Sequence, residues 1–106
     1  MGSITISTSF TVDGATVVDV RGEIDVSVCG ELLDALREEI ARRRPPKLVV
    51  DLLHVTFLDS AGMNTLIAAH REAKRLGTSF MVRHPSEFVA RQMRVTGTYE
   101  VLTSGQ

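Results

Sequence analysis

The chain has 106 residues, of which 43% are hydrophobic and 24% are charged, and its formal net charge at pH 7 is −1. These values are typical of a single folded domain over residues 1–106, and they exclude a surface charge that would attract nucleic acid or an anionic membrane. The lone cysteine, Cys29, excludes an internal disulfide and fits a reducing compartment. No leader opens the chain and no stretch of 18 apolar residues occurs, so we expect a cytoplasmic domain without a membrane segment.

Two β-strands are predicted near the N-terminus. Residues 4–24 are rich in β-branched side chains, and Asp13-Gly14 separates a run that ends at Val12 from a run that begins at Thr16. Because a tight hairpin turn needs positive φ angles, an Asp-Gly pair between two such runs predicts a β-hairpin. Gly22 is expected to end the second strand.

An amphipathic helix is predicted from about Ser27 to Arg44. Its apolar residues recur at helical spacing: Cys29, Leu32, Leu33, Leu36 and Ile40. Pro45-Pro46 stops this helix. The three arginines at 42–44 could indicate a phosphate contact, but they are better explained as cations at a helix C-terminus, where the helix dipole favours positive charge.

The rest of the chain alternates strands with helices. A strand with apolar residues on both faces is predicted over Lys47–Leu53, within a run that leads into Phe57-Leu58, and it suits the centre of a sheet covered by helices on one or both sides. The later predicted elements are a helix over Ala61–Arg75 that Gly77 ends, a strand over Ser79–Arg83, a helix from Pro85-Ser86 to near Gly97, and a final turn over Tyr99–Leu102. This order predicts an α/β fold, a mixed β-sheet with an N-terminal hairpin and about three to four packed α-helices.

Asp59 and Ser60 place an acid and a hydroxyl at the start of a predicted helix, a position suited to a catalytic nucleophile, a helix cap or a covalent switch. Catalysis is disfavoured because a nucleophile elbow needs glycine two residues before the serine, and Leu58 stands there. The three histidines are His54, His70 and His84, and none of them has a spacing in the sequence that requires contact with Ser60. We therefore expect that the protein is not an enzyme.

Metal and cofactor binding are not expected either. The histidines are far apart in the sequence, and the only cysteine lies on a predicted helix. No glycine-rich phosphate loop follows any predicted strand, so a nucleotide site lacks its motif.

The helix-cap interpretation of Ser60 explains only part of this segment. The hydroxyl would accept a hydrogen bond from first-turn amides, and Asp59 could share or compete for that role. Ala61 and Gly62 are small and leave the hydroxyl uncrowded, although glycine near a helix start costs roughly 0.5–1 kcal/mol relative to alanine. An accessible hydroxyl on a rigid backbone suits a residue that another protein's active site modifies.

Two segments of the chain, GEIDVSVCGELLDAL and LVVDLLHVTFLDSAGMNTLIAAHREAKRLG, resemble the STAS domain of bacterial anti-sigma factor antagonists. The resemblance covers nearly the whole chain, with its motifs in the order and spacing of that family. It implies that the unphosphorylated domain binds an anti-sigma factor with serine kinase activity and so frees the sigma factor. Phosphorylation by that kinase would release the domain, and a serine phosphatase would restore it.

The resemblance also assigns roles to individual residues. Ser60 matches the phosphoacceptor, Asp59 the acid before it and Gly62 the glycine of the motif, while Asp25 matches the aspartate of a turn that lies near the phosphoacceptor. The expected partner-binding residues are Asp25, Asp59, Ser60, Ala61, Gly62, Met63 and Asn64.

Two alternatives stay open at this point. Either Thr56 or Thr65 could be a second phosphosite. The chain could also be a constitutive STAS-type subunit of a signalling or transport assembly, with the same fold and no phosphoswitch.

Overall fold

The N-terminal hairpin forms one edge of the sheet in the computed structural model, which describes residues 2–104. Strand β1 (Ile4–Phe10) pairs antiparallel with β2 (Thr16–Ile24) along its whole length. The connection turns at Gly14, whose φ of +91° is in the region that glycine adopts without strain. The hairpin predicted from Asp13-Gly14 is confirmed.

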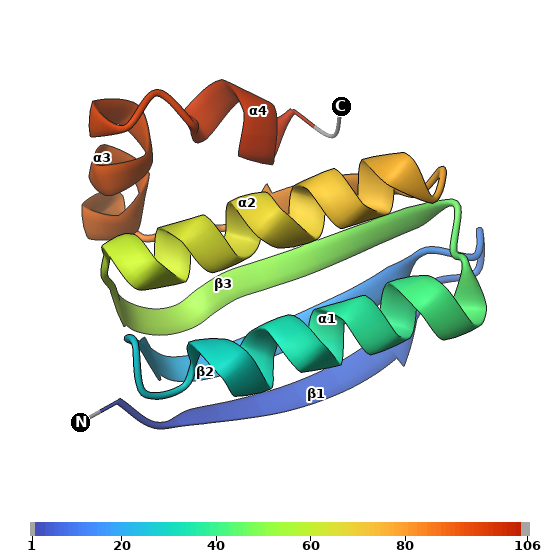
Figure 1. The fold of residues 1–106 in the computed structure, drawn as a ribbon, viewed down its shortest axis with the longest axis horizontal. Coiled ribbons are helices and arrows are strands. Elements are labelled where there is room, and N and C mark those ends of the chain that lie inside the picture. The colour runs from blue at the N-terminus through green and yellow to red at the C-terminus, as the bar shows by residue number, and fades with distance from the viewer. Residues whose placement is uncertain (1, 105–106) are drawn as a thin grey trace.

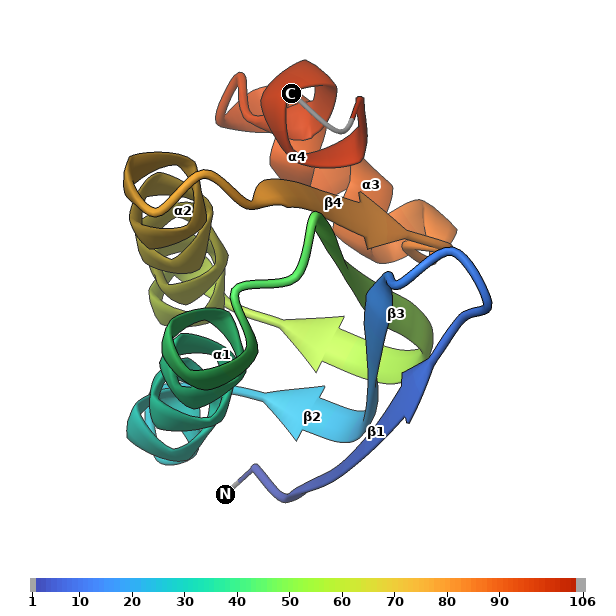
Figure 2. The ribbon, with the colours of Figure 1, turned by 90° about the vertical axis from the view of Figure 1, so that its right-hand side faces the viewer.

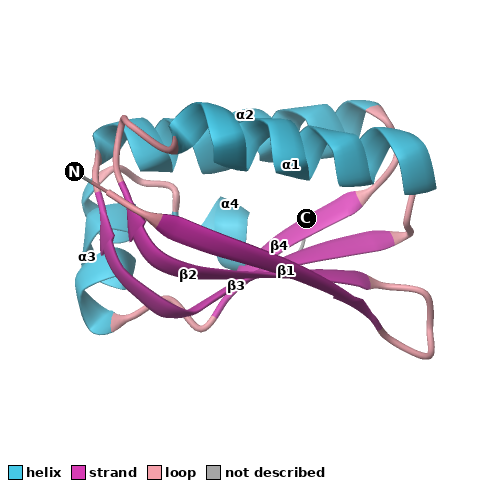
Figure 3. Ribbon diagram, turned by 90° about the horizontal axis from the view of Figure 1, so that it is seen from below, coloured by secondary structure: helices cyan, strands magenta, loops and turns pink. Residues whose placement is uncertain are grey.

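The sheet is mixed and has the strand order β1-β2-β3-β4. Strand β3 (Lys47–Leu58) pairs in parallel with β2 on one side and with β4 (Ser79–Arg83) on the other. The crossover helices α1 (Cys29–Arg43) and α2 (Ser60–Arg75) lie side by side on one face of the sheet, as Figures 1 and 3 show. Successive parallel strands joined by crossovers of the same hand place their helices on the same face.

Two short helices complete the fold beyond β4. Helix α3 (Glu87–Val95) and helix α4 (Tyr99–Thr103) gather at the β4 side of the sheet, away from the hairpin (Figure 2). The predicted α/β fold, with a hairpin, a mixed sheet and four helices, is therefore confirmed. No helix among residues 2–104 is long and apolar enough to cross a membrane.

The main hydrophobic core lies between the sheet and the two long helices. The sheet contributes alternate residues of strands β2, β3 and β4, because successive strand side chains point to opposite faces. These strand residues are Val18, Val20, Leu48, Val50, Leu52, Phe80 and Val82. The helices contribute residues at helical spacing: Leu32, Leu36, Ile40, Met63, Leu66, Ala69 and Ala73.

Two strand ends differ from the sequence prediction. Strand β2 does not end at Gly22 but continues to Ile24, with an irregularity in its pairing to β3 between Gly22 and Glu23. Gly22 has a φ of +115°, and a Cβ built there would lie 2.1 Å from the carbonyl oxygen of Ser3, so glycine lets the hairpin strands approach closely. Strand β3 extends past Leu53 to Leu58, because β2 supplies pairing partners as far as Ile24.

The arginines predicted at the end of the first long helix lie there. Arg42 and Arg43 occupy the last turn of α1 and pair with Glu38 and Glu39, at 2.7 and 3.0 Å respectively. Each pair spans four residues of one exposed helix face, and such pairs contribute only about 0.3–0.5 kcal/mol to stability. These two arginines are therefore explained by the helix itself.

Candidate functional site

Two strand-to-helix connections meet at one end of the sheet. Ile24 at the end of β2 pairs with Leu58 at the end of β3, and these strands are parallel. Parallel strands end at the same edge, so the connection that starts at Asp25 lies beside the one that holds Asp59. Figure 1 shows both connections at the left, where α1 and α2 begin.

Asp59 is the N-cap of α2. Its backbone is extended, with φ −97° and ψ −174°, and its carboxylate accepts a hydrogen bond from the amide of Gly62 at 2.8 Å. The amide of Asp59 donates to the carbonyl of Ile24 at 3.2 Å, which ties the start of α2 to the end of β2. Of the two capping residues that the sequence left open, Asp59 is therefore the one that caps the helix, because it precedes the first helical residue and Ser60 is that residue.

Gly62 brings the first turn of α2 against the sheet. A Cβ at this position would lie 2.8 Å from a methyl carbon of Ile24 and 2.9 Å from a methyl carbon of Leu58. Contacts this short force the neighbours to move, so only glycine fits without adjustment. From the sequence, we expected Gly62 to keep the Ser60 hydroxyl uncrowded. The structure shows that Gly62 also lets the helix pack closely on the ends of two strands.

The hydroxyl of Ser60 is open. The residue is exposed, and its side chain makes no hydrogen bond to any of residues 2–104. Its backbone is nevertheless fixed, because the cap at Asp59 and the close packing at Gly62 hold the residues on either side. The arrangement presents a free hydroxyl from a rigid position.

Asp25 organises the neighbouring connection. Its carboxylate accepts hydrogen bonds from the Ser27 amide at 2.9 Å and from the Ser27 hydroxyl at 2.5 Å. Those bonds, led by the one from the hydroxyl, lower the pKa of Asp25 from its ordinary value. No lysine or arginine in the described chain forms an ion pair with Asp25 or Asp59. Among residues 2–104, these two carboxylates therefore have no lysine or arginine partner.

The predicted partner-binding residues divide by exposure. Ser60 and Asn64 are exposed, and Asp25, Asp59 and Ala61 are half-buried. Gly62 is buried, and Met63 is only 3% exposed because its side chain belongs to the core. The expectation that Met63 faces a partner is therefore contradicted, since one turn of helix directs it toward the sheet and leaves Asn64 outside.

The histidines do not form a catalytic group with Ser60. His54 lies on β3, and the strand from His54 to Leu58 alone spans about 13 Å. His70 lies ten residues along α2 from Ser60, about 15 Å along the helix axis. The Nδ1 of His84 lies 3.3 Å from the carboxylate of Asp51, which is farther back along β3. Among the described residues there is also no group of three or more potential ligands that could hold a metal ion.

The two threonines named as possible second phosphosites differ in access. Thr65 is 6% exposed, and its hydroxyl donates to the carbonyl of Ala61 at 2.9 Å. Thr56 is exposed on β3. Of the two, only Thr56 presents its side chain at the surface.

The sequence reasoning missed a group of exposed apolar side chains near Ser60. Val26 follows Asp25 and is 75% exposed, and Phe57 precedes the Asp59 cap and is 40% exposed. The ring of Phe57 stacks on that of Phe88 of α3, with centroids 6.1 Å apart. The alternation of strand faces around the buried Leu58 was the signal that could have placed Phe57 outside.

Comparisons with known proteins identify the family of this domain. The family model described as "Mlab, STAS domain" matches residues 8–103. The anti-sigma-F factor antagonist RsfB of Mycobacterium tuberculosis is 36% identical over 67 residues, which cover 63% of this chain and 52% of that protein. The matched part of the chain thus spans about half the length of these curated relatives.

Solved structures show the same architecture. An anti-sigma factor antagonist from Mycobacterium paratuberculosis matches with a TM-score of 0.76 and 35% sequence identity. The match covers 94% of this chain and 83% of that protein's chain. The unphosphorylated form of the anti-sigma factor antagonist SpoIIAA has a TM-score of 0.73 over 90% of this chain and 83% of its own, and at 16% identity it supports the fold alone. The family match over residues 8–103 and the mycobacterial structure together show that this chain belongs to the STAS-domain family of anti-sigma factor antagonists.

Proposed function

We propose that this protein is an anti-sigma factor antagonist controlled by phosphorylation of Ser60. In its unphosphorylated form it binds an anti-sigma factor that is a serine kinase, and the sigma factor is thereby freed. The kinase transfers phosphate to Ser60 and the complex dissociates, and a serine phosphatase returns the protein to its binding form. The observation that carries the proposal is the exposed Ser60 hydroxyl, which lies on a fixed backbone and has no hydrogen bond to the described chain.

The fold can accept a phosphate at this position. Phosphoserine carries about −1.5 to −2 charges at neutral pH, and the N-terminus of a helix favours negative charge by roughly 0.3–1 kcal/mol. Asp59 rather than Ser60 caps the helix, so modification of the hydroxyl removes no capping bond. We therefore expect the phosphorylated protein to stay folded.

A bound partner would respond differently. A surface that covers Ser60 must desolvate the phosphate beside Asp59 and near Asp25, where the described chain supplies no pairing cation. Two like unit charges about 4 Å apart repel by about 4 kcal/mol at an effective dielectric of 20. A micromolar affinity corresponds to about 8 kcal/mol, so repulsion of this size is enough to release the partner.

The surroundings of Ser60 suit a protein interface. Exposed Val26, Phe57 and Phe88 supply apolar surface, while Asp25 and Asn64 supply polar groups. Interfaces commonly combine an apolar, aromatic-rich centre with a polar rim. We place the partner over the Asp25 turn, over Asp59, Ser60 and Ala61, and over the exposed side of α2 at Asn64. Gly62 and Met63 support this surface from beneath.

The experiment that tests the proposal is phosphorylation by the kinase that the unphosphorylated protein captures from its native lysate. Incubation with that kinase and ATP should add one phosphate to the wild type, as measured by intact mass, and none to Ser60→Ala. The variant should keep its affinity for the kinase, and its melting temperature should change little because Asp59 retains the cap. Thr56→Val is the matched control and should incorporate phosphate like the wild type. Full incorporation into folded Ser60→Ala would refute the assignment.

A second candidate has support from the family match. The family match over residues 8–103 shows a STAS domain, and that fold is equally compatible with a constitutive STAS-type subunit of a signalling or transport assembly without phosphoswitching. The two candidates differ in one measurement. A constitutive subunit would bind its partner with the same affinity before and after incubation with kinase and ATP.

A further inference from the structure

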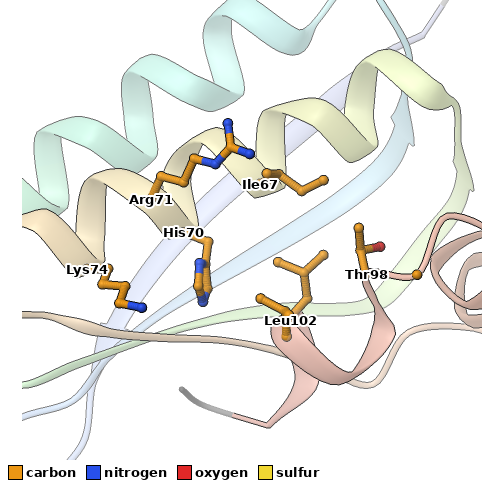
Figure 4. Close-up of a pocket in the computed structure, with 8 residues that line it drawn as sticks. Ile67, His70, Arg71, Lys74, Thr98 and Leu102 are labelled. Carbon is orange, nitrogen blue, oxygen red and sulfur yellow. The ribbon is translucent and has the colours of Figure 1, made fainter.

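A cavity of about 360 Å³ lies between the C-terminal half of α2 and the segment that joins α3 to α4. Figure 4 shows its two walls, one from α2 and the other from the loop and α4. The lining residues are Ile67, His70, Arg71, Lys74, Gly97, Thr98, Val101 and Leu102. Its volume is within the range of sites that bind small molecules, about 300–1,000 Å³.

The inner part of the cavity is apolar and fixed. Leu102 is fully buried, Ile67 is half-buried, and Val101 stands at the rim with 48% of its surface exposed. His70 is 8% exposed, and its ring packs edge-on against Phe80 with centroids 5.8 Å apart. These side chains form a preformed hydrophobic wall.

Two cations border this wall. Arg71 and Lys74 are exposed and stand three residues apart on α2; in Figure 4 Lys74 points to the same side as His70, whereas Arg71 points away from it. No acidic residue stands three or four positions from either one in the sequence, whereas Arg75 one position further pairs with Glu72. No ion pair within residues 2–104 involves Arg71 or Lys74.

We propose that this cavity binds a small amphipathic anion, with a carboxylate or phosphate head and a short hydrocarbon chain. The chain lies against Ile67 and Leu102, and the head pairs with Lys74, whose side chain is on the same side of α2 as His70 in Figure 4. Arg71 is exposed and has a long side chain, so its guanidinium can turn to the same head group. Hydrogen bonds between charged groups supply more binding energy than neutral ones, which explains why an anion is preferred over a neutral ligand.

Head-group selection rests on these cations rather than on a hydroxyl. The hydroxyl of Thr98 already lies 3.3 Å from the carbonyl of Met93, 3.4 Å from the sulfur of Met63 and 2.9 Å from the hydroxyl of Thr96. The site therefore selects negative charge joined to an apolar chain, and it accepts either kind of head group.

The cavity is distinct from the proposed phosphorylation site. Lys74 lies 14 residues after Ser60 on the same helix, a distance of about 20 Å along the axis. The inference does not depend on phosphorylation, because no residue of the cavity belongs to the Ser60 surface. Failure of one proposal leaves the other standing.

The test is titration of the wild-type protein with octanoate, octyl phosphate, octanol and acetate, followed by calorimetry and amide chemical shifts. We expect octanoate or octyl phosphate to bind about tenfold more tightly than octanol, which lacks the charge, and acetate, which lacks the chain. Tighter binding of octanoate assigns a carboxylate ligand, and tighter binding of octyl phosphate assigns a phosphate ligand. Shift changes should centre on residues 67–74 and 97–102.

Variants separate the cavity from general surface binding. Arg71→Gln combined with Lys74→Gln should weaken binding of the octyl anion about tenfold, because both head-group cations are lost. Val101→Trp should block the rim, and its exposed position lets the larger side chain be accommodated without disturbing the core. Arg91→Gln, an exposed arginine of α3 outside the cavity, is the matched control and should bind like the wild type. Equal binding of octanol, unchanged affinity in the double variant, or shifts centred elsewhere would overturn the proposal.

Discussion

The two long helices begin at the same end of the sheet, and their first turns are built differently. Helix α2 has a side-chain cap from Asp59 and a glycine, Gly62, pressed against two strand ends. Helix α1 has no side-chain cap, and a Cβ added to its own early glycine, Gly30, would meet nothing within 4 Å. The comparison shows that one helix start is held by the rest of the fold, whereas the other is held by its own loop.

The difference assigns different parts to the two aspartates. Asp59 connects α2 to the end of β2 through its amide and to its own first turn through its carboxylate. Asp25 bonds to Ser27 within the connection it opens and also to the backbone of Gly2, and its carbonyl accepts from the amide of Val28 at 3.1 Å. A phosphate on Ser60 is therefore attached to the helix start that Asp59 caps and that Gly62 packs against the two strand ends. Four sets of variants test this comparison, in order of decreasing expected effect.

The largest effect is expected when a negative charge is introduced at Ser60, and it is expected on the affinity for the partner. Ser60→Asp should weaken binding of the anti-sigma kinase by up to about 4 kcal/mol, because a carboxylate is added beside Asp59 in the interface. Ser60→Asn has nearly the same size without the charge and should weaken binding much less. Calorimetry at two salt concentrations measures the affinity of each variant for the kinase. The difference in affinity between Ser60→Asp and Ser60→Asn should narrow only in part at high salt, because a buried contact is poorly screened. Equal losses for the two variants would show that the site rejects bulk, and the electrostatic mechanism would be wrong.

The second largest effect is expected on the stability of the fold when Gly62, which is packed against two strand ends, is replaced. Gly62→Ala should lower the free energy of unfolding by about 1–3 kcal/mol, because the new methyl group overlaps Ile24 and Leu58. Gly30→Ala is the matched control and should raise it by about 0.4–1 kcal/mol, since the methyl meets open space and the unfolded chain loses freedom. Urea unfolding of both variants measures the contrast. Equal effects of the same sign would show that the two helix starts are not packed differently.

A smaller loss is expected when the cap is removed. Asp59→Ala should lower the free energy of unfolding by about 0.5–2 kcal/mol, because the Gly62 amide loses its acceptor. Asp59→Asn should recover most of this loss, since asparagine caps equally well without the charge. Thermal unfolding followed by circular dichroism makes the measurement. If Asp59→Ala were as stable as the wild type and Ser60→Ala were destabilised, Ser60 rather than Asp59 would be the capping residue.

The smallest effect concerns Asp25 and depends on pH. Hydrogen bonds from Ser27 lower the pKa of Asp25 below 3.8, so its contribution to stability is present above that pH and is lost as the pH falls through the pKa in the folded protein. Asp25→Asn should therefore be slightly less stable than the wild type at pH 7, and the difference should shrink as the pH falls through the pKa of Asp25 in the folded protein. Unfolding curves across this range give the comparison. A difference that persists at the acidic end would mean that the carboxylate charge is not what stabilises the turn.

Much of this arrangement was predictable from local sequence. The Asp13-Gly14 hairpin, the limits of β4 and the extent of the two long helices follow from turn chemistry, periodicity and terminal residues, which act within a few positions of the chain. The juxtaposition of the Asp25 turn and the Asp59 cap also agrees with the parallel order of the strands that precede them. The predictions that differ from the structure are the end of β2 at Gly22 and the exposure of Met63, while the choice between Asp59 and Ser60 as the cap was left open by the sequence.

The sequence by itself determined where the helices and strands form and that an acid and a hydroxyl open α2, because these features depend on neighbours in the chain. Only the tertiary structure decided which of the two residues caps the helix, why residue 62 must be glycine, and which side chains around Ser60 reach the surface. Each of those depends on contact between β2, β3 and α2, whose residues are far apart in the sequence. The cavity between α2 and α4 has the same origin, since a short terminal helix acquires a binding wall only where it packs beside another helix.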